Sequence, residues 1–482
     1  MTTGDPRRQG RPQRSAQAPS ARRRSGDPAR AAAFEVLREV AASDAYANLV
    51  LPPLLRRRGI RGRDAAFATE LAYGALRLRG RYDAVLALAA ERAVSAIDPP
   101  LLDVLRLGAH QVLGMRVPAH AAVSETVALA RSTVGAGPAQ MVNAVLRRVA
   151  ADPLGTWLAR IEEAAGEDPV ARLAVRESHP EWVVRALRQA LVADGRDAGE
   201  LPALLEADNA APAVTLVARP GLITRTELLG EVTGGRPGRW TPTAVVAAGG
   251  DPGGLDAVRA ARAGVQDEGS QLVALALLAA ALDGSDSRWL DLAAGPGGKS
   301  ALLGAAATTR AAHLVATELQ PHRARLVERA VAALPAGTVE VRCGDGRDVG
   351  PGEPEAYDRV LIDAPCTGLG ALRRRPEARW RRTPADLSTL TQLQAELLAS
   401  AVDAVRPGGV VGYVTCSPHV AETRAVVADV VRRRTDVVQL DAREAVRAVA
   451  GPDIPLGDGP AVQLWPHVHG TDAMHLALLR RW

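Results

Sequence analysis

Alternating strand-like and helix-like segments, which run from about Gln266 to the C-terminus, constrain the fold of this chain more than any other feature. Short apolar runs recur there, and each is followed by a longer stretch with helical periodicity. This alternation predicts a doubly wound, mainly parallel sheet with helices on both faces. In such sheets ligands bind at the carboxyl ends of the strands, near the point where the strand order reverses. Functional residues are therefore expected where the predicted strands end.

The N-terminal part of the chain has a different pattern. Residues 28–150 carry apolar positions at three- and four-residue spacing, which is typical of amphipathic helices. Pro52-Pro53, Asp98-Pro99-Pro100 and Pro118 interrupt this pattern, so we expect helices that end at these breaks. The sequence therefore predicts an all-α unit here.

The region between these two parts mixes both signals. An amphipathic helix is expected before Pro180 and another after it, whereas VTLVAR at 214–219 reads as a strand. Short β-like runs with glycine and proline follow at 220–262. A connector helix and a small α+β segment are therefore predicted.

These patterns divide the chain, whose 482 residues are too many for one ordinary core. We expect a disordered basic arm at 1–27, a helical domain at 28–150, a connector with a small α+β segment at 151–262, and an α/β domain at 263–482. Residues 1–30 hold eight arginines and two acids, which fits either a nucleic-acid-binding arm or a solvated tail without a partner.

Composition excludes several classes of protein. A hydrophobic content of 47% with 23% charged residues argues against a wholly disordered chain. No apolar run is long enough to span a membrane and no signal-peptide core is evident, so we expect a cytosolic, non-membrane protein. The three cysteines are too scattered for a disulfide framework and lack the spacing of a zinc site, so no metal is expected.

Four acids stand at or near successive predicted strand ends: Asp291, Glu318, Asp345 and Asp363. A carboxylate at a strand end faces the crevice mouth, where it can accept hydrogen bonds from ligand hydroxyls or amines. A series of four beside a glycine loop favours a ligand site over chance.

The glycine loop is DLAAGPGGKS, residues 291–300. A Walker A loop requires a glycine where Ala293 stands, and a dinucleotide fingerprint requires one where Ser300 stands. S-adenosylmethionine fits better, because its carboxylate suits the start of the following helix, while Glu318 and Asp345 suit its ribose and adenine. A purely structural tight turn is the alternative. Lys299 within this loop is the single lysine of the chain, which indicates a requirement for a compact ammonium group.

Two cysteine motifs, DAPCTG at 363–368 and TCSPH at 415–419, each place a thiol where a predicted strand ends. Cys416 precedes a predicted helix whose N-terminus would favour the thiolate. A thiolate that adds to C6 of cytosine makes C5 nucleophilic enough to accept a methyl group. Asp363 is placed to bind the base edge and Cys366 to assist release of the adduct. The alternative is two small buried side chains.

Methylation of an exocyclic amine needs no covalent intermediate and typically uses an Asn/Asp-Pro-Pro-aromatic sequence at this position. DAPC has a thiol where that motif has its aromatic residue. The third cysteine, Cys343, lies before GDGR in mid-strand, and we interpret it as structural.

The stretch ALRRRPEARWRR at 371–382 follows the first cysteine motif and carries six arginines. Arginine suits phosphates and tryptophan suits base stacking, so the stretch is interpreted as an RNA-contacting lip over the site, with a solvated loop as the alternative. The proposed RNA-binding residues are Arg373, Arg374, Arg375, Arg379, Trp380, Arg381 and Arg382.

With these motifs in hand, the chain resembles the RsmB/Sun/Fmu group of bacterial 16S ribosomal RNA cytosine-C5 methyltransferases, within the NOL1/NOP2/Sun family. The resemblance rests on DLAAGPGGKS, DAPCTGLG, RRRPEARW and TCS, and on LRLGAHQVLGMRVPAHAAVSETVALAR and VNAVLRR in the helical part, which resemble the NusB-like domain of this group. It covers nearly the whole chain beyond the basic arm.

The resemblance implies a class I methyltransferase domain of Rossmann-like fold that uses S-adenosylmethionine on 16S rRNA. It implies Cys416 as nucleophile, Cys366 in turnover, and Lys299 in the active site. The cofactor residues that it implies are Ala293, Ala294, Gly295, Pro296, Gly297, Gly298, Lys299, Glu318, Asp345 and Asp363.

The sequence departs from the family pattern at three places. AAGPGG stands where relatives often have CAAPGG, Thr423 follows Glu422 where many have asparagine, and LWPHVHGTDAMHLALLRR lacks the usual terminal aromatic pair. A monomer is expected. A second class of function also stays open, namely a NusB-type RNA-binding or antitermination factor with a non-catalytic cofactor domain, although mere binding does not require two strand-end cysteines.

Overall fold

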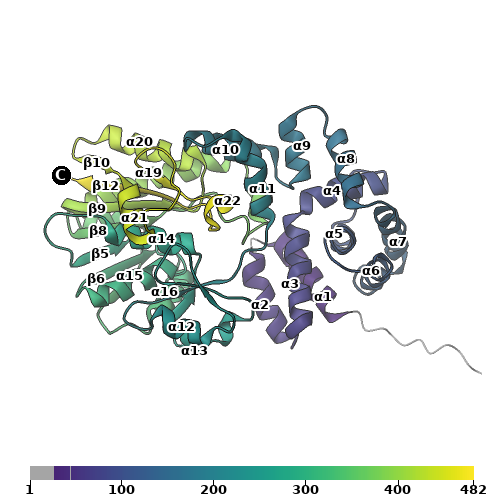
Figure 1. Cartoon of the computed structure of the whole chain (residues 1–482), viewed down its shortest axis with the longest axis horizontal. Coiled ribbons are helices and arrows are strands. Elements are labelled where there is room, and N and C mark those ends of the chain that lie inside the picture. Colours follow the sequence, from purple (N-terminus) through teal and green to yellow (C-terminus); the bar gives the residue numbers. More distant parts are fainter. Residues whose placement is uncertain (1–26, 44) are drawn as a thin grey trace, which may run out of the picture.

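The computed structural model describes residues 27–43 and 45–482. The basic arm expected at 1–27 therefore lies almost wholly outside the described residues. The chain forms a helical domain at one end and an α/β domain at the other (Figure 1). This arrangement confirms the predicted multidomain fold. Among the described residues no helix is long and apolar enough to cross a membrane.

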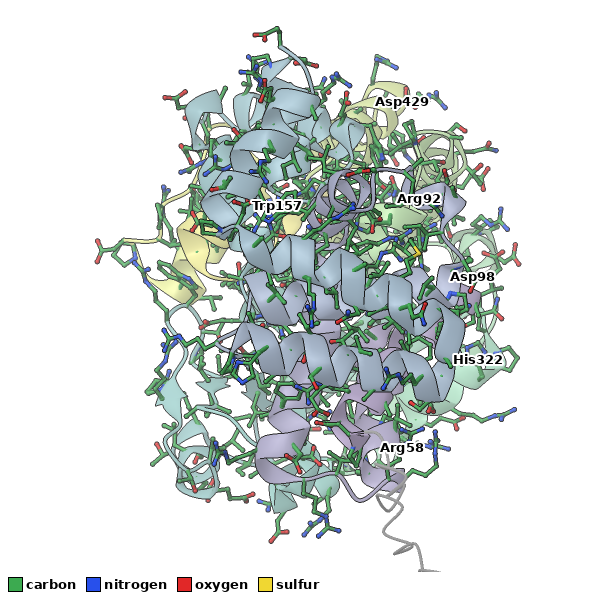
Figure 2. The ribbon with its side chains drawn as sticks, turned by 90° about the vertical axis from the view of Figure 1, so that its right-hand side faces the viewer. Arg58, Arg92, Asp98, Trp157, His322 and Asp429 are labelled. Atoms are coloured by element: carbon green, nitrogen blue, oxygen red, sulfur yellow. The ribbon has the colours of Figure 1, made fainter. Side chains whose placement is uncertain are left out.

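The helical domain is built from seven α-helices and one 3-10 turn among the described residues. Figure 2 looks onto the outer face of this domain, with Arg58, Arg92 and Asp98 along its border. Its core is made mainly of alanine, leucine and valine side chains, and all seven helices contribute to it. The elements are α1 (Pro28–Ala42), α2 (Ala47–Arg57), α3 (Gly62–Arg77), α4 (Arg79–Ala90), η1 (Val94–Ala96), α5 (Pro99–Leu113), α6 (Ala119–Thr133) and α7 (Ala136–Ala151).

Local sequence explains most of the helix starts. The side chain of Asp27 accepts hydrogen bonds from the amides of Ala29 and Arg30, and so caps α1. Pro99 opens α5, where the missing N–H costs nothing, as the sequence predicted. The expected break at Pro52-Pro53 is wrong, however, because both prolines lie inside α2. Burial of the leucines on the other face of α2 outweighs the two lost backbone hydrogen bonds.

A connector of four α-helices links the helical domain to the rest of the chain, two of them before Pro180, where one was expected. Part of this connector packs on the α/β domain, since α10 and α11 share a hydrophobic cluster with Leu369, Leu372 and Trp465. The elements are α8 (Leu154–Ala164), α9 (Pro169–Arg176), α10 (Glu181–Ala193), η2 (Ala198–Glu200) and α11 (Leu201–Asn209).

The small α+β segment forms a four-stranded antiparallel sheet in the order β2-β3-β1-β4. Its last strand takes in Ala263–Val265, three residues that the sequence pattern placed in the next domain. The elements are β1 (Thr215–Ala218), α12 (Arg225–Glu231), β2 (Arg236–Pro237), β3 (Ala244–Val246), η3 (Pro252–Gly254), α13 (Asp256–Arg259) and β4 (Ala263–Val265).

The α/β domain contains the large sheet, in the strand order β10-β12-β9-β8-β5-β6-β7 with β11 beside β12. The five strands from β9 to β7 are parallel, whereas β12 runs antiparallel to both of its neighbours. The strands are β5 (Arg288–Asp291), β6 (His313–Glu318), β7 (Val339–Cys343), β8 (Tyr357–Asp363), β9 (Val405–Thr415), β10 (Val437–Leu440), β11 (Val462–Gln463) and β12 (His475–Arg481).

Helices cover both faces of this sheet (Figure 1), as the alternating pattern predicted. α14, α15, α16 and α21 form one layer, and α17, α19 and α20 form the other. The helices and turns are α14 (Glu268–Ala279), α15 (Gly298–Thr309), α16 (Pro321–Val331), η4 (Gly346–Asp348), α17 (Val349–Gly352), α18 (Ala378–Arg381), α19 (Asp386–Ala404), η5 (Val420–Glu422), α20 (Arg424–Arg433), α21 (Ala442–Ala450) and α22 (Pro466–His469).

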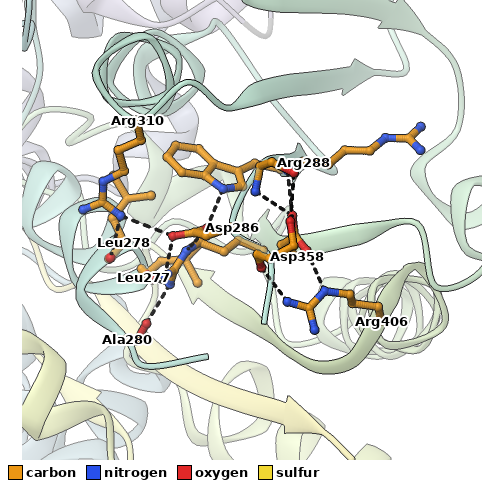
Figure 3. Close-up of polar contacts among 12 residues, drawn as sticks. Leu277, Leu278, Ala280, Asp286, Arg288, Arg310, Asp358 and Arg406 are labelled. Carbon is orange, nitrogen blue, oxygen red and sulfur yellow. Dashed lines mark hydrogen bonds and ion pairs between the residues drawn. The ribbon is translucent and has the colours of Figure 1, made fainter. Parts of the chain in front are cut away.

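The amino ends of the central strands are tied together by ion pairs (Figure 3). Asp286 accepts hydrogen bonds from the indole of Trp289 and from both Nε and Nη2 of Arg359, at 2.7–2.9 Å. Asp358 accepts hydrogen bonds from the backbone amides of Ser287 and Arg288, at the start of β5, and from Nε of Arg406, at 2.6–2.7 Å. This network fixes β5, β8 and β9 at the edge of the sheet opposite the strand ends where ligands are expected.

Candidate active site

The acids predicted at strand ends lie where the strand order reverses. β5 is the first strand of the domain and lies between β6 and β8, so the crevice opens at its carboxyl end. Asp291, Glu318 and Asp363 are the last residues of β5, β6 and β8. Asp345 follows β7 by two residues and caps the turn η4. The sequence pattern placed all four correctly along the chain.

The glycine loop from Ala293 to Gly298 connects β5 to α15. Gly295 and Gly297 have φ angles of 57° and 92°, which favour glycine. A Cβ at Gly297 would lie 2.8 Å from Cα of Val327 in α16, so only glycine lets the loop pass so close to this helix. Glu318 accepts a hydrogen bond from the amide of Gly295 at 3.0 Å and thereby joins the ends of β5 and β6. The loop presents the free N–H groups at the start of α15 to the crevice.

Gln266 lies near this loop in the folded chain, although it lies far from the sequence motif that defines the loop. An added Cβ on Gly298 would lie 3.9 Å from the amide carbon of Gln266. The side chain is 7% exposed, and its Oε1 has no hydrogen-bond partner among the described residues. Burying an unpaired amide oxygen is costly, so this atom is a candidate acceptor for a ligand ammonium or hydroxyl. QDEGSQ carries no recognisable motif, and only the structure brings it to the loop.

Asp291 is completely buried beneath the loop. One carboxylate oxygen accepts a hydrogen bond from Oγ of Ser300 at 2.7 Å, and the other has no partner among the described residues. Burial raises the pKa of this carboxyl group to about 7, although Ser300 favours the charged form. Asp291 is therefore placed as a support for the loop, below the residues that face the crevice.

Lys299 and Asp363 form an ion pair with Nζ and Oδ2 2.7 Å apart. The Lys299 side chain is 9% exposed and the Asp363 side chain 31%, so the carboxylate is the partner that faces the crevice. Burial of Lys299 opposes its charge, but Asp363 outweighs this effect, and the pKa of Lys299 is raised overall. The single lysine of the chain is thus held as a buried cation at the site.

The two motif cysteines face each other across the ends of β8 and β9, with their Sγ atoms 3.4 Å apart, and both are free thiols. The hydrogen bond from Cys366 lowers the pKa of Cys416, and Arg375 and Lys299 act in the same direction against burial and Asp363. The pKa of Cys366 is raised well above its ordinary value, first by the same hydrogen bond and then by burial. These shifts favour the thiolate on Cys416 and keep Cys366 as the protonated thiol of the pair.

The expected cause of this thiolate was wrong. The α-helix that follows Cys416 begins only at Arg424, after the short turn η5, so no helix N-terminus stands at the sulfur. Side-chain charges and the second thiol take its place.

Glu422 holds the two cysteine loops together. Its carboxylate accepts hydrogen bonds from the amide and hydroxyl of Thr367, the residue after Cys366, and from the hydroxyl of Ser417, the residue after Cys416. Glu422 is fully buried, and the amide of Gln394 adds a further contact at 3.3 Å. The separation of the two sulfur atoms therefore depends on this carboxylate.

The interpretation of 371–382 as an RNA-contacting lip is wrong for most of its residues. Arg373 and Arg374 pair with Asp267 and Asp472 and are 8% and 23% exposed. Arg379 is completely buried and donates to the carbonyl groups of Arg77, Ser178 and Asp208 and to the side chain of Asn209. These arginines satisfy buried acceptors, so they are unable to reach a phosphate.

Trp380 and Arg381 join the α/β domain to the helical domain. The Trp380 ring packs against Gly80, where an added Cβ would lie 2.4 Å from it, and the guanidinium carbon of Arg79 lies over the ring at 5.8 Å from its centroid. Arg381 donates to the carbonyl groups of Val40, Ser43 and Ala45. Neither side chain is free to bind RNA as expected, whereas Arg375 is exposed and Arg382 half-buried.

Two further expectations concern cysteine and metals. Cys343 is the last residue of β7 and is exposed, so its expected placement in mid-strand is wrong. No group of three or more His, Cys, Asp or Glu side chains in the described residues is arranged to hold a metal ion.

Chemically, the crevice combines a glycine loop with three strand-end acids on one side and a thiolate with its partner thiol on the other. The Lys299–Asp363 ion pair connects the two, because Lys299 directly follows the glycine loop and Asp363 lies three residues before Cys366. Such a site can bind a cofactor beside a nucleophile, and it leaves one carboxylate to contact a substrate.

Two family models match the sequence. The model of the 16S rRNA methyltransferases RsmB/F matches residues 279–480, and the model of the NusB family matches residues 27–151. Together they cover the α/β domain and the helical domain.

Similar proteins extend along nearly the whole chain. A Mycobacterium tuberculosis (strain ATCC 25618 / H37Rv) protein named only as a methyltransferase is 55% identical over 95% of this chain and 98% of its own length. The ribosomal RNA small subunit methyltransferase B of Pseudomonas putida is 31% identical over 86% and 91% of the two chains. Among solved structures, PH0851 covers 94% of this chain and 99% of its own with a TM-score of 0.77 and 19% identity. NSun6 from Pyrococcus horikoshii covers 62% and 98% with a TM-score of 0.51 and 17% identity, and these two likenesses concern the fold.

Proposed function

Because the chain belongs to the RsmB/F family of 16S rRNA methyltransferases, we propose that it methylates C5 of a cytosine in 16S rRNA, with Cys416 as the covalent nucleophile. The methyl donor is S-adenosylmethionine. Methylation of rRNA follows from membership in this family. Methylation at C5 and the covalent step are argued from the residues of the crevice.

The residues of the crevice fit S-adenosylmethionine. The first amides of α15 are free to receive a carboxylate from the cofactor. The positive φ angles of Gly295 and Gly297 let the loop 293–298 turn tightly just before this helix. Glu318 is nearly buried at the end of β6, where one oxygen orients the loop and the group as a whole suits the ribose hydroxyls. Asp345 lies one strand further on, where it suits the adenine. This cofactor supplies an activated methyl group and takes no other part in the chemistry.

The cysteine pair supplies what C5 of cytosine lacks. Addition of the Cys416 thiolate to C6 breaks the aromaticity of the ring and makes C5 nucleophilic. After C5 has accepted the methyl group, loss of the C5 proton and elimination of Cys416 restore the ring. Cys366 lies 3.4 Å from the departing sulfur and assists its release. Asp363, oriented by Lys299, is placed to hydrogen-bond the edge of the base.

RNA contacts fall to the helical domain and to Arg375, the exposed arginine of 371–382. The match of residues 27–151 to the NusB family supports RNA binding by the helical domain. The alternative function, a non-catalytic RNA-binding factor, assigns no role to the Cys366–Cys416 pair, and no observation favours it.

The observation that carries this proposal is the Cys366–Cys416 pair beside the Lys299–Asp363 ion pair at the switch point of the sheet. The test is incubation of the full-length protein with S-adenosylmethionine and unmodified 16S rRNA, followed by mass spectrometry of the nucleosides. We expect 5-methylcytidine with the wild-type protein and none with Cys416→Ser, while cofactor affinity measured by calorimetry stays the same. Wild-type turnover by Cys416→Ser would eliminate the covalent mechanism. Bisulfite sequencing of rRNA from a deletion strain then identifies the nucleotide.

A further inference from the structure

Arg375 stands apart from the other arginines of its segment because it is exposed and has no carboxylate partner within residues 27–43 and 45–482. Its backbone amide donates to the carbonyl of Ala371 at 2.9 Å, and the amide of Gly370 donates to the carbonyl of Cys416 at 2.9 Å. A Cβ on Gly370 would lie 2.1 Å from the carbonyl oxygen of Ala473, so only glycine permits this close approach. The turn that carries Arg375 is therefore anchored to the backbone of the nucleophile.

A residue of the helical domain holds the guanidinium of Arg375. The guanidinium carbon lies 4.9 Å from the centroid of the Tyr46 ring, at the start of α2. Arg381 also lies over this ring, at 5.3 Å. A cation within about 6 Å of an aromatic face is attracted to it, so Tyr46 limits the directions that Arg375 can take.

The backbone around Tyr46 is itself fixed to the α/β domain. The amide of Ala47 donates to Oε1 of Glu377 at 2.9 Å. Arg381 donates to the carbonyl groups of Val40 and Ala45 at 2.7 and 2.6 Å, and both of these residues precede Tyr46 in the chain. Contacts on both sides of Tyr46 thus hold the junction of α1 and α2 against the segment that follows Cys366.

Four charged or titratable groups act on the charge state of Cys416, and they are Cys366, Asp363, Arg375 and Lys299. Lys299 is already neutralised by Asp363 at 2.7 Å, and Asp363 alone would oppose a thiolate. Arg375 is therefore the cation of this set that forms no ion pair with a carboxylate of the described residues, and its charge also acts on the carboxyl group of Glu377. Its position decides how much positive potential reaches the sulfur.

From this arrangement we propose that the helical domain completes the catalytic site: Tyr46 is a positioning residue that holds Arg375 beside the Cys416 thiolate. The inference rests on the proposed function in taking Cys416 as the nucleophile. It gives the helical domain a task beyond RNA binding, since the loop between α1 and α2 sets the reactivity of a sulfur in the other domain.

The test measures the rate at which iodoacetamide alkylates Cys416 in the full-length protein as a function of pH, by mass spectrometry of the peptide that contains it. No RNA or cofactor is needed, so the result is independent of methylation. We expect Tyr46→Ala and Arg375→Ala each to slow alkylation at pH 7 about threefold or more, as the midpoint of the profile moves up by about half a pH unit. The double variant is expected to match Arg375→Ala alone.

Two variants serve as controls. Tyr46→Phe keeps the ring and is expected to keep the wild-type profile. Arg310→Ala removes a comparable arginine–tryptophan contact, 5.8 Å over Trp289, at the opposite edge of the sheet, and is expected to change nothing at Cys416. Thermal unfolding of every variant identifies any variant that fails to fold. If Tyr46→Ala fails to fold, the alkylation profiles of Tyr46→Phe and Arg375→Ala are compared instead.

The inference is overturned if Tyr46→Ala folds and leaves the profile unchanged while Arg375→Ala shifts it, or if Arg375→Ala itself shifts nothing. If both shift it as expected but Cys416→Ser still methylates RNA, the positioning role stands and the covalent mechanism falls. The two failures are therefore distinguishable.

Discussion

Sγ of Cys366 lies 3.4 Å from Sγ of Cys416, although the two residues are 50 positions apart in the chain. The strand ends of β8 and β9 bring them together, and Glu422 keeps the two loops in register. This contact lowers the pKa of Cys416 and raises the pKa of Cys366, so it favours the thiolate on Cys416.

Removal of the donor should make the nucleophile less reactive. Cys366→Ala abolishes the hydrogen bond that lowers the pKa of Cys416, so its pKa should rise. At pH 7, alkylation of Cys416 should then be slower by roughly three- to tenfold, with the wild-type rate recovered at high pH. An unchanged rate at pH 7 would show that the second thiol does not stabilise the thiolate.

Glu422 should matter for turnover more than for cofactor binding. Glu422→Gln replaces an acceptor of four hydrogen bonds with an amide, so the two loops should shift apart. Misplacement of reacting groups by about 1 Å costs on the order of 100-fold in rate, and kcat should fall by about that factor. The KM for S-adenosylmethionine should stay near its wild-type value. A stable variant with normal kcat would refute this role.

Asp291 should make stability depend on pH in a defined direction. Its pKa is about 7 in the folded chain and about 3.9 in the unfolded chain, so between these values the native state keeps a proton that the unfolded state has lost. The contribution of Asp291 to the free energy of unfolding should therefore decrease as the pH rises from about 4 to about 7. Urea unfolding of wild type and Asp291→Asn at several pH values isolates this contribution. The difference between the two proteins should change over that range and level off above pH 7, whereas a constant difference would contradict the assignment.

The segment 371–382 should stabilise the packing of the α/β domain against the helical domain and the connector. Arg379→Ala leaves at least three buried acceptors without a donor, and it should lower the free energy of unfolding by about 2–4 kcal/mol. Arg382→Ala, the half-buried arginine of the same segment, is the matched comparison and should cost less than about 0.5 kcal/mol. Equal effects of the two substitutions in urea unfolding would contradict this stabilising role.

The parts of the site that the sequence predicted are those set by local pattern. The alternation of strands and helices places Asp291, Glu318 and Asp363 at strand ends, and parallel neighbours must end at the same edge of the sheet. The glycine loop and the two cysteine motifs follow from the same logic. These residues can therefore be placed in the fold without knowledge of contacts between distant parts of the chain.

The parts that the sequence missed depend on contacts between domains. The arginine run 373–382 was expected to be exposed and to contact RNA, because the carbonyl groups that bind Arg379 come from three distant segments of the chain. Tyr46 and Gln266 likewise gain their neighbours only in the folded chain. Pro52 and Pro53 read as helix breakers, yet the packing of α2 outweighs their local preference.

The central claim is a covalent bond between Cys416 and C6 of a cytosine, and trapping that bond tests it most directly. The Cys366→Ala protein is incubated with S-adenosylmethionine and 16S rRNA, digested with nuclease and protease, and examined by mass spectrometry. We predict a methylated cytidine nucleotide attached to the peptide that contains Cys416, and no such product when Cys416 is also changed to serine. If RNA is methylated while no adduct forms in any variant and the Cys416→Ser protein stays active, the covalent account is contradicted.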